Sequence, residues 1–269
     1  MNDSVILVRG GGDLASGVVH RLFRCGIKVV VAELPNPLAV RRSVSFANTV
    51  YTGKHQVEDI SAVLVRSAVE IEKTIKAGLV PVIVDPEMEI VRDLDPKIVV
   101  DARMIKFAQA RYATSIFSIG LGPGFIAGET CNAVIETKRG HHLGRVYWQG
   151  GAEPDSGVPE RVGGHESERV LRSPAQGKIK NYREIGDLVR KGDIVAEVSG
   201  KPVISEFDGV IRGLVYEGID VTAGLKIGDI DPRNDPALCH QVSDKALAIG
   251  GGVLEALLTR KNIRKLLWT

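Results

Sequence analysis

The segment that most constrains the fold is the first 33 residues, where a glycine-rich turn separates two apolar runs. Residues 4–8 (SVILV) are apolar, and RGGGDLASG follows them directly. Residues 13–24 then place apolar side chains at helical spacing, and residues 27–33 (IKVVVAE) form a second apolar run. This order predicts a strand, a glycine turn, a helix and a second strand, which is how a parallel α/β sheet begins.

The alternation continues through the first 150 residues. Residues 67–78 have the pattern of a helix with a glycine stop, and three apolar runs at 80–86, 97–103 and 115–120 are typical of buried strands. The last of these runs leads into a second glycine turn, GLGPGF. We therefore predict a Rossmann-like domain over residues 1–150 that binds a nucleotide or another phosphate-bearing ligand.

A change of composition marks the end of this domain. Residues 151–172 are rich in glycine, proline and charge without hydrophobic period, and are predicted to be a linker or loop. Two similar segments follow, GKIKNYREIGDLVRKGDIVAEV from Gly177 and GVIRGLVYEGIDVTAGLKIGDI from Gly209, offset by 32 residues. Such a repeat indicates two hairpin-like units that bury a core by interlocking.

The repeated segments resemble a barrel-sandwich hybrid, the fold of biotinyl and lipoyl carrier domains, and we predict such a β module over residues 173–232. Those carriers place a modified lysine between the two halves, within Met-Lys-Met for biotin. Lys201 stands there in EVSGKPVIS and is followed by Pro202. The difference favours a docking or structural module over a carrier.

Residues 236–269 are predicted to be a helical segment that packs back on the core. Ser243 is a suitable N-cap, and the glycines at 250–252 interrupt an apolar helical pattern. Each glycine costs about 1 kcal/mol relative to alanine inside a helix. We therefore expect another backbone or a ligand to approach this helix closely.

Composition excludes several classes of protein. A net charge of +2 is too small for a nucleic-acid surface, and no run approaches the ~20 apolar residues of a membrane span. The three cysteines are too far apart for a disulfide framework or a cysteine-based zinc site, which fits a cytoplasmic protein. The N-terminus shows no leader pattern. Homo-oligomerisation is left open.

The first glycine turn is the main candidate binding site. Gly10, Gly12 and Ala15 satisfy G-x-G-x-x-G/A after a strand, and Glu33 follows where an acid would accept a ribose 2′-OH. Asp13 either competes with a phosphate for the helix amides or caps the helix and points away. Arginines after the second strand could grip a phosphate or make surface salt bridges, and the second glycine turn could be an anion nest or a tight structural turn. The candidate cofactor-binding residues are Gly10, Gly11, Gly12, Asp13, Ala15, Ser16, Glu33, Arg41, Arg42, Gly120, Gly122 and Gly124.

Other polar residues carry alternative roles. Asp101 and Arg103 end a predicted strand and form either part of a ligand site or a salt bridge. His142 is a candidate acid or base, but it and His141 point in different directions in a strand, so we predict no metal site. Cys239 precedes the Ser243 cap, where a lowered pKa would make it a candidate nucleophile, and the alternative is a packing role.

Several segments together resemble the YqeB family, probable accessory proteins of the selenium-dependent molybdenum hydroxylase system. They are RGGGDLASG, ELPNPLAVRRSVSFANTVYTG, IGLGPGF, IETKRGHHLGRV and SDKALAIGGGVLEALL, and they extend from near residue 4 to near 258. The resemblance implies a cytoplasmic maturation factor whose partner is the molybdenum hydroxylase apoprotein. The Rossmann-like part is also similar to the xanthine dehydrogenase accessory factor, which binds molybdenum cofactor. The resemblance supplies no catalytic residues.

Three hypotheses follow. In the first, a maturation factor holds molybdopterin, or its dinucleotide form, on the two glycine turns, Cys239 carries sulfur or selenium, and the β module docks the hydroxylase. In the second, Gly10, Gly12, Ala15 and Glu33 bind NAD(H) in an oxidoreductase of the same pathway. In the third, the protein is a scaffold that binds no ligand. Whether the protein is an enzyme is left open.

Overall fold

A computed structural model describes residues 5–107, 112–154, 164 and 167–268. It divides into two compact units. The first unit comprises Met1–Pro37, Phe46–Asp155 and Val242–Thr269, and the second comprises Leu38–Ser45 and Ser156–Gln241. Half of the predicted linker at 151–172, residues 155–163 and 165–166, lies outside the described residues, as does residue 4 of the first predicted strand. The described remainder of the linker includes a 3-10 helix (Ser167–Arg169) and a strand (Val170–Arg172) that the prediction of a loop did not foresee.

The first unit is built on a nine-stranded sheet in the order β10-β9-β7-β6-β1-β2-β5-β4-β3. The pairs from β9 through β4 are parallel, and the hairpin strands β3 and β10 at the two edges pair antiparallel. A separate two-stranded sheet joins β8 (Ile126–Ala127) to β11 (Gly150–Gly151). The strands of the large sheet are β1 (Ile6–Arg9), β2 (Val29–Glu33), β3 (Lys54–Val57), β4 (Ile60–Val65), β5 (Val80–Val84), β6 (Ile98–Asp101), β7 (Phe117–Leu121), β9 (Ala133–Ile135) and β10 (Val146–Tyr147).

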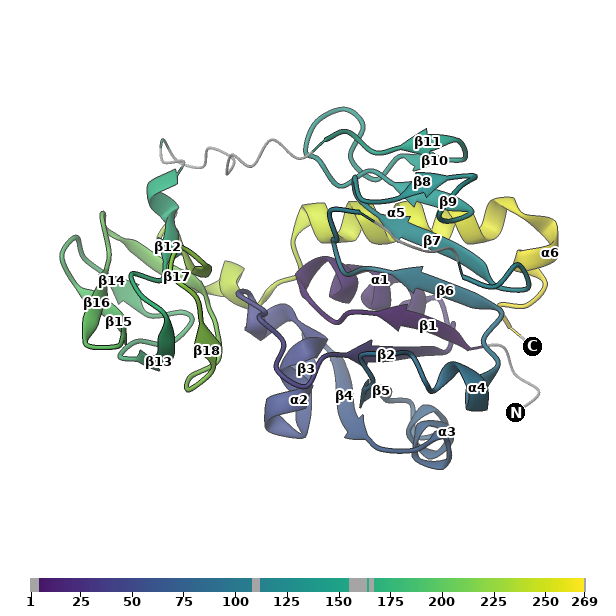
Figure 1. Cartoon of the computed structure of the whole chain (residues 1–269), viewed down its shortest axis with the longest axis horizontal. Helices are drawn as coiled ribbons and strands as arrows, with labels where there is room; N and C mark the ends of the chain where they lie inside the picture. Colours follow the sequence, from purple (N-terminus) through teal and green to yellow (C-terminus); the bar gives the residue numbers. More distant parts are fainter. Residues whose placement is uncertain (1–4, 108–111, 155–163, 165–166, 269) are drawn as a thin grey trace. The chain divides into compact units, whose positions relative to one another are not determined.

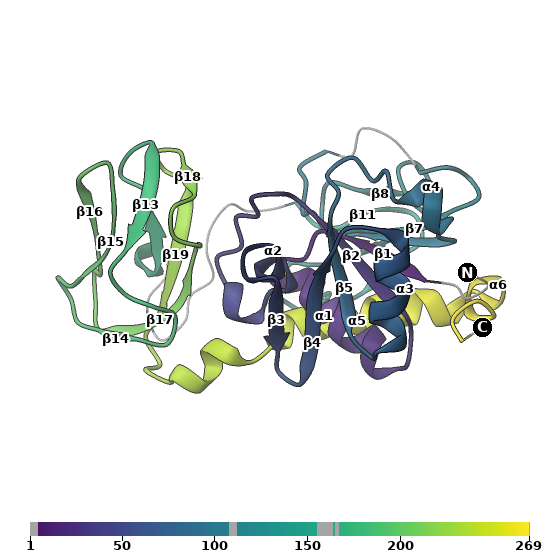
Figure 2. The ribbon, with the colours of Figure 1, turned by 90° about the horizontal axis from the view of Figure 1, so that it is seen from below.

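Helices cover both faces of this sheet (Figures 1 and 2). Leu7, Val30 and Val99 share one buried cluster with residues of α3 (Ala68–Lys76) and α4 (Val91–Leu94). On the opposite face lie α1 (Asp13–Arg24) and α5 (Asp244–Thr259). Short helices α2 (Thr49–Thr52) and α6 (Lys261–Arg264) complete the unit. No helix in the described part of the chain is both long and apolar enough to cross a membrane.

Helices α1 and α5 approach each other at glycine positions. A Cβ at Gly17 would collide with the backbone of Ala246, and one at Gly250 would collide with the backbone of Gly17. Gly252 is likewise pressed against the Gly144 carbonyl, whereas a Cβ at Gly251 would meet nothing within 4 Å. The expected close backbone approach is therefore confirmed at two of the three consecutive glycines. The predicted Ser243 cap is also confirmed, since its side chain accepts the Ala246 N–H.

The second unit contains two four-stranded antiparallel sheets, in the orders β12-β19-β17-β14 and β16-β15-β13-β18. Short 3-10 helices flank them: η1 (Arg42–Val44), η3 (Ser167–Arg169) and η4 (Pro236–His240). The strands are β12 (Val170–Arg172), β13 (Gly177–Asn181), β14 (Leu188–Val189), β15 (Ile194–Val198), β16 (Lys201–Ile204), β17 (Gly209–Leu214), β18 (Asp220–Val221) and β19 (Lys226–Asp231).

The internal repeat has a matching hydrogen-bond pattern. The Gly186 N–H donates to the Ile211 carbonyl at 2.8 Å, and 32 residues on from Gly186, the Gly218 N–H donates to the Ile179 carbonyl at 2.8 Å. Each half thus pairs with the other, because β13 pairs with β18 and β14 with β17. The two halves interlock, as the offset of the glycines predicted.

The repeat begins one strand earlier than the sequence comparison suggested. Ser173 and Ser205 are 32 residues apart, and each hydroxyl donates to the carbonyl two residues on at 2.6 Å. β12 and β16 therefore occupy equivalent positions as the first strands of the two halves. The similarity of SPAQG, from Ser173, to SEFDG, from Ser205, is the sequence signal that would have shown this earlier start.

Two features differ from the sequence-based organisation. The β3–β4 hairpin, in the segment between the predicted second strand and the predicted helix at 67–78, was not predicted. Residues Leu38–Ser45 belong to the second unit, although they were placed in the first domain. The α/β class is confirmed in the form of a large, mostly parallel sheet with additional antiparallel sheets.

Candidate functional site

The parallel strands β1, β2, β5, β6 and β7 end along one edge of the large sheet. From β1 the chain continues to β2 on one side, while β6 lies on the other side of β1. Ligands of open α/β sheets bind outside the carboxyl ends of the strands at such a reversal of strand order. The register places Arg9 beside Asp101, so the residues that follow these two strands are neighbours.

The three glycines after β1 have different surroundings. Gly10 has φ +94°, a conformation that favours glycine. A Cβ at Gly11 would lie 2.8 Å from the Ala47 nitrogen, so the chain itself fills that side. A Cβ at Gly12 would meet nothing within 4 Å. Gly12 is therefore the position of the turn that faces open space.

Helix α1 begins directly after this open position. Gly12 is its N-cap, so Asp13 is a first-turn acid that complements the positive end of the helix. Ala15 and Ser16 are buried, and the Ser16 hydroxyl donates to the Gly11 carbonyl at 3.2 Å and accepts the Phe46 N–H at 2.9 Å. Ser16 therefore holds the turn in place from inside, and Ala15 is buried in the core.

Glu33 at the end of β2 binds the glycine turn. Its Oε2 accepts the Gly11 N–H at 2.6 Å, and its Oε1 accepts the Leu34 N–H at 2.7 Å. Burial raises the pKa of Glu33, and the two backbone hydrogen bonds oppose that rise. Each carboxylate oxygen keeps a second lone pair, so the group can still accept a bond from a ligand hydroxyl.

A polar cluster surrounds the buried Asp101 at the ends of β1 and β6. Arg103 donates from Nε and Nη2 to the two oxygens of Asp101 at 2.8 and 2.7 Å, and the Tyr112 hydroxyl donates to Oδ2 of Asp101 at 2.9 Å. Arg9 Nη1 lies 3.5 Å from the Tyr112 hydroxyl, and its Nη2 donates to the Pro86 carbonyl at 2.9 Å. Burial and the Asp101 charge raise the pKa of Tyr112 to about 12. We call Arg9, Gly10–Gly12, Glu33, Asp101, Arg103 and Tyr112 the sheet-edge site.

Sequence reasoning named Asp101 and Arg103 but missed two members of this cluster. Arg9 directly precedes the three glycines, and its position next to the turn was an available signal. Tyr112 lies eleven residues after Asp101, the last residue of β6, and no sequence pattern marks it as a site residue. The salt-bridge interpretation of Asp101 and Arg103 is correct in geometry, because they form a bidentate pair.

The second glycine turn is filled by the protein's own atoms. A Cβ at Gly120 would collide with the Phe125 side chain, and one at Gly124 with the Ile105 carbonyl. Gly122 has φ +82° and donates its N–H to the Ile135 carbonyl at 3.0 Å. These contacts are those of a packed structural turn, one of the two alternatives for GLGPGF.

Arg41 and Arg42 belong to the second unit, where both are engaged. Arg41 Nη2 donates to the Gln241 carbonyl at 3.0 Å and lies 3.4 Å from the Leu238 carbonyl oxygen. Arg42 pairs with Glu184, donates to the Leu214 carbonyl at 3.0 Å and lies over the Tyr216 ring. The structure does not place these arginines in the unit that holds the glycine turn, so we leave them out of the sheet-edge site.

The two predicted catalytic residues belong to different units, His142 to the first and Cys239 to the second. His142 Nδ1 is 2.9 Å from Glu153 Oε1, and Glu153 also pairs with Lys138 at 3.0 Å. His141 is exposed. Cys239 is fully buried in η4 of the second unit, with Sγ 3.6 Å from the Ile211 carbonyl oxygen. Burial raises the pKa of Cys239, so the expected lowering is wrong in direction.

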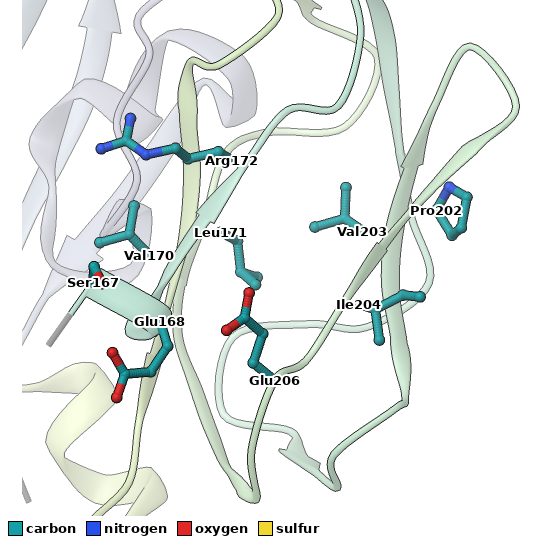
Figure 3. Close-up of a pocket in the computed structure, with 9 residues that line it drawn as sticks. All are labelled: Ser167, Glu168, Val170, Leu171, Arg172, Pro202, Val203, Ile204 and Glu206. Carbon is teal, nitrogen blue, oxygen red and sulfur yellow. The ribbon is translucent and has the colours of Figure 1, made fainter. Parts of the chain in front are cut away.

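The second unit carries a groove between the equivalent strands β12 and β16, with a volume of about 470 Å³ (Figure 3). Leu171 and Val203, equivalent in the two halves, are buried beneath it, and Ile204 is half-exposed. Figure 3 shows Glu168 and Glu206 near one end and Arg172 near the other. Both strands lie at sheet edges, so each pairs along one side only.

Comparison with known proteins shows one clear relative. The chain is 44% identical over 255 residues to the uncharacterized protein YqeB of Escherichia coli K12. The match covers 94% of this chain and 47% of that protein, so the chain spans about half the length of the curated relative. This similarity supports the resemblance to the YqeB family. No protein-family model matches the chain.

Solved structures are only distantly similar. An aspartoacylase family protein from Mesorhizobium loti is 10% identical, with 85% of this chain and 84% of that chain covered and a TM-score of 0.28. A succinylglutamatedesuccinylase/aspartoacylase from Rhodobacter sphaeroides is 13% identical, with 85% of each chain covered and a TM-score of 0.26. We base nothing on similarities this weak.

Proposed function

We propose that this protein is a cytoplasmic maturation factor for a molybdenum hydroxylase and binds a phosphate-bearing ligand at the sheet-edge site. The observation that carries the proposal is Gly12, the open position between β1 and the start of α1. The first amides of a helix and its positive end attract phosphate. The YqeB resemblance supplies the biological context, a selenium-dependent molybdenum hydroxylase system.

The neighbouring charges suit such a ligand. Glu33 is bound by backbone amides and Asp101 by Arg103 and Tyr112, so both carboxylates at this edge already have donors. Arg9 is the last residue of β1, and Arg103 follows the end of β6 and pairs with Asp101. In this proposal the Gly12 side of the turn receives a phosphate and the two guanidinium groups add positive charge. Molybdopterin, or its dinucleotide form, is the proposed cargo.

The fold assignment belongs to the same proposal. We assign the first unit to a Rossmann-like class because of its β1–α1–β2 unit and the strand reversal at β1. We assign the second unit to a barrel-sandwich hybrid because its two halves interlock. In this proposal the second unit docks the hydroxylase apoprotein, and an extended segment of that partner occupies the groove between β12 and β16.

One observation favours a second candidate, an NAD(H)-dependent oxidoreductase of the same pathway. Glu33 ends β2 and is bound to the glycine turn, which is where an acid accepts a ribose 2′-OH in dinucleotide-binding folds. Equilibrium titration of the chain with NADH distinguishes the two. Heat or fluorescence changes that saturate below millimolar NADH support the oxidoreductase, and their absence removes it.

The maturation proposal is tested in cells that express the hydroxylase with or without this chain. The proposal predicts that the hydroxylase is made but lacks activity when the chain is absent, and that the chain copurifies with the apoprotein. A hydroxylase that gains full activity without the chain would contradict it. Substitution Ile204→Lys in the groove should reduce copurification, whereas the exposed Lys178→Gln substitution in the same unit should not.

A further inference from the structure

A histidine and two carboxylates, none of them a sheet-edge residue, converge in the first unit. His20 lies on α1, and Glu58 and Asp59 form the turn between β3 and β4. His20 Nε2 is 2.8 Å from Glu58 Oε2. One ligand atom from each of the three residues lies within 4.8 Å of the others.

The histidine is buried, and only one of its two ring nitrogens has a hydrogen-bond partner among the described residues. The His20 side chain is 7% exposed, and its Nδ1 has no hydrogen-bond partner among the described residues. An unsatisfied buried polar atom costs about 1–3 kcal/mol. The buried Nδ1 therefore costs folding free energy, while Nε2 is the ring nitrogen that faces Glu58.

Glu58 is held in a fixed orientation. Its Oε1 accepts the Val242 N–H at 2.9 Å, which leaves Oε2 directed toward His20. Val242 is the first residue of the segment that leads into α5. The carboxylate thus connects the β3–β4 turn, helix α1 and the start of the C-terminal segment.

Asp59 supplies the accessible side of the cluster. It is exposed, and Arg24 Nη2 donates to its Oδ1 at 2.6 Å. Its Oδ2 lies outside that hydrogen bond, and a cation can reach it from solvent.

We propose that His20, Glu58 and Asp59 form a binding site for a divalent transition-metal cation. One imidazole nitrogen and two carboxylate oxygens are ligands that Zn²⁺ and Mn²⁺ accept, and solvent at the exposed side completes the coordination. In this proposal the cation binds one imidazole nitrogen of His20 and one carboxylate oxygen each of Glu58 and Asp59. Arg24 opposes this binding because its guanidinium shares the Asp59 carboxylate and repels a second positive charge.

The site goes beyond the proposed maturation function and does not depend on it. A bound cation would fix α1 to the β3–β4 turn and, through Glu58, to the segment at Val242. Sequence reasoning missed the site because His20 and Glu58 are 38 residues apart and lie in different elements. The prediction that there is no metal site considered only the cysteines and the neighbouring His141 and His142.

The test uses the full chain after treatment with a chelator, and Zn²⁺ and Mn²⁺ as probes. Competition with a chromophoric chelator measures affinity, and native mass spectrometry counts bound ions. The proposal predicts one ion per chain. Asp59→Asn and His20→Gln should each weaken binding about tenfold or more, with folding checked by circular dichroism. Asp59 is exposed, so that variant should fold normally.

Two further variants make the result specific. Asp220→Asn removes another exposed aspartate that pairs with a cation, Lys178 at 3.0 Å, and should leave metal affinity unchanged. Arg24→Gln removes the competing guanidinium and should tighten binding several-fold. The proposal is overturned if the chain binds neither metal at millimolar concentration, if binding survives both Asp59→Asn and His20→Gln, or if Arg24→Gln weakens it.

Discussion

The backbone N–H of Gly11 donates a 2.6 Å hydrogen bond to the Glu33 carboxylate, which ties the turn after β1 to the end of β2. Ala47 packs on the other side of Gly11 and donates its N–H to the Gly11 carbonyl at 2.8 Å. The middle glycine is therefore held on both sides by the protein itself. The adjacent Gly12 is left facing outward, which is why we place the ligand there.

Glu33 makes stability depend on pH. Burial raises its pKa above the ordinary 4.5, so the folded state keeps this proton to higher pH than the unfolded chain does. The protonated Glu33 side chain therefore stabilises the folded state. Its contribution is complete below pH 4.5 and is lost as the pH rises through the folded-state pKa. The unfolding free energy of the wild type minus that of Glu33→Gln should fall over this range, by about 1.4 kcal/mol per unit of raised pKa.

Urea unfolding at a series of pH values measures this difference. The exposed Glu206→Gln variant serves as the matched control and should give a difference that does not follow the Glu33 pattern. A difference between wild type and Glu33→Gln that stays constant from pH 4 to 7 would show that the Glu33 pKa is not raised.

Gly11→Ala should destabilise the protein much more than Gly12→Ala. A Cβ at Gly11 would lie 2.8 Å from Ala47 nitrogen, so Gly11→Ala should lower the unfolding free energy by about 1–3 kcal/mol. Gly12→Ala meets no atom within 4 Å and should cost less than about 1 kcal/mol, the loss of a better N-cap residue. Chemical denaturation compares them, and equal losses would contradict the described turn.

The glycines of α5 offer a second contrast. Gly250→Ala and Gly252→Ala would push the helix against Gly17 and Gly144, and each should destabilise the protein by about 1–3 kcal/mol. Gly251→Ala meets nothing within 4 Å and should stabilise the helix by up to about 1 kcal/mol. Melting temperatures should therefore rise for Gly251→Ala and fall for the other two. A fall for all three variants would contradict the packing.

The elements that were predicted are those that a pattern of neighbouring residues in the sequence marks. The apolar runs around RGGGDLASG predicted β1, α1 and β2, and the glycine offset predicted the interlocked halves of the second unit. The β3–β4 hairpin was missed because its turn uses Glu58 at φ +52° in place of glycine. The assignment of Arg41 and Arg42 also required tertiary contacts, since their partners are about 140–200 residues away in sequence.

The candidate site was predicted in part for the same reason. Gly12 and Glu33 follow from spacing, because a helix start and a strand end are visible in the sequence. Which glycine faces outward depends on Ala47, a residue brought to Gly11 by tertiary folding. The burial of Cys239 likewise arises from the second unit's own packing, which the helix cap at Ser243 does not reveal.

The three cysteine thiols should react with a disulfide reagent at very different rates. Cys25 is exposed, whereas Cys131 and Cys239 are buried, and burial raises the pKa of Cys239. Less thiolate at neutral pH and no access to solvent both slow its reaction. A disulfide reagent should label one thiol rapidly in the native chain, and Cys25→Ser should remove that fast phase. A fast phase that persists in Cys25→Ser and disappears in Cys239→Ser would restore the nucleophile hypothesis.

The most direct test of the account is native mass spectrometry of freshly purified wild-type chain beside the Gly12→Ala and Gly251→Ala variants. Both substitutions add a methyl group where the structure has open space, but only the first lies at the sheet-edge site. We predict a bound pterin or dinucleotide in the wild type and in Gly251→Ala, and its loss in Gly12→Ala. A wild-type chain without either ligand, or equal retention in Gly12→Ala, would contradict the account.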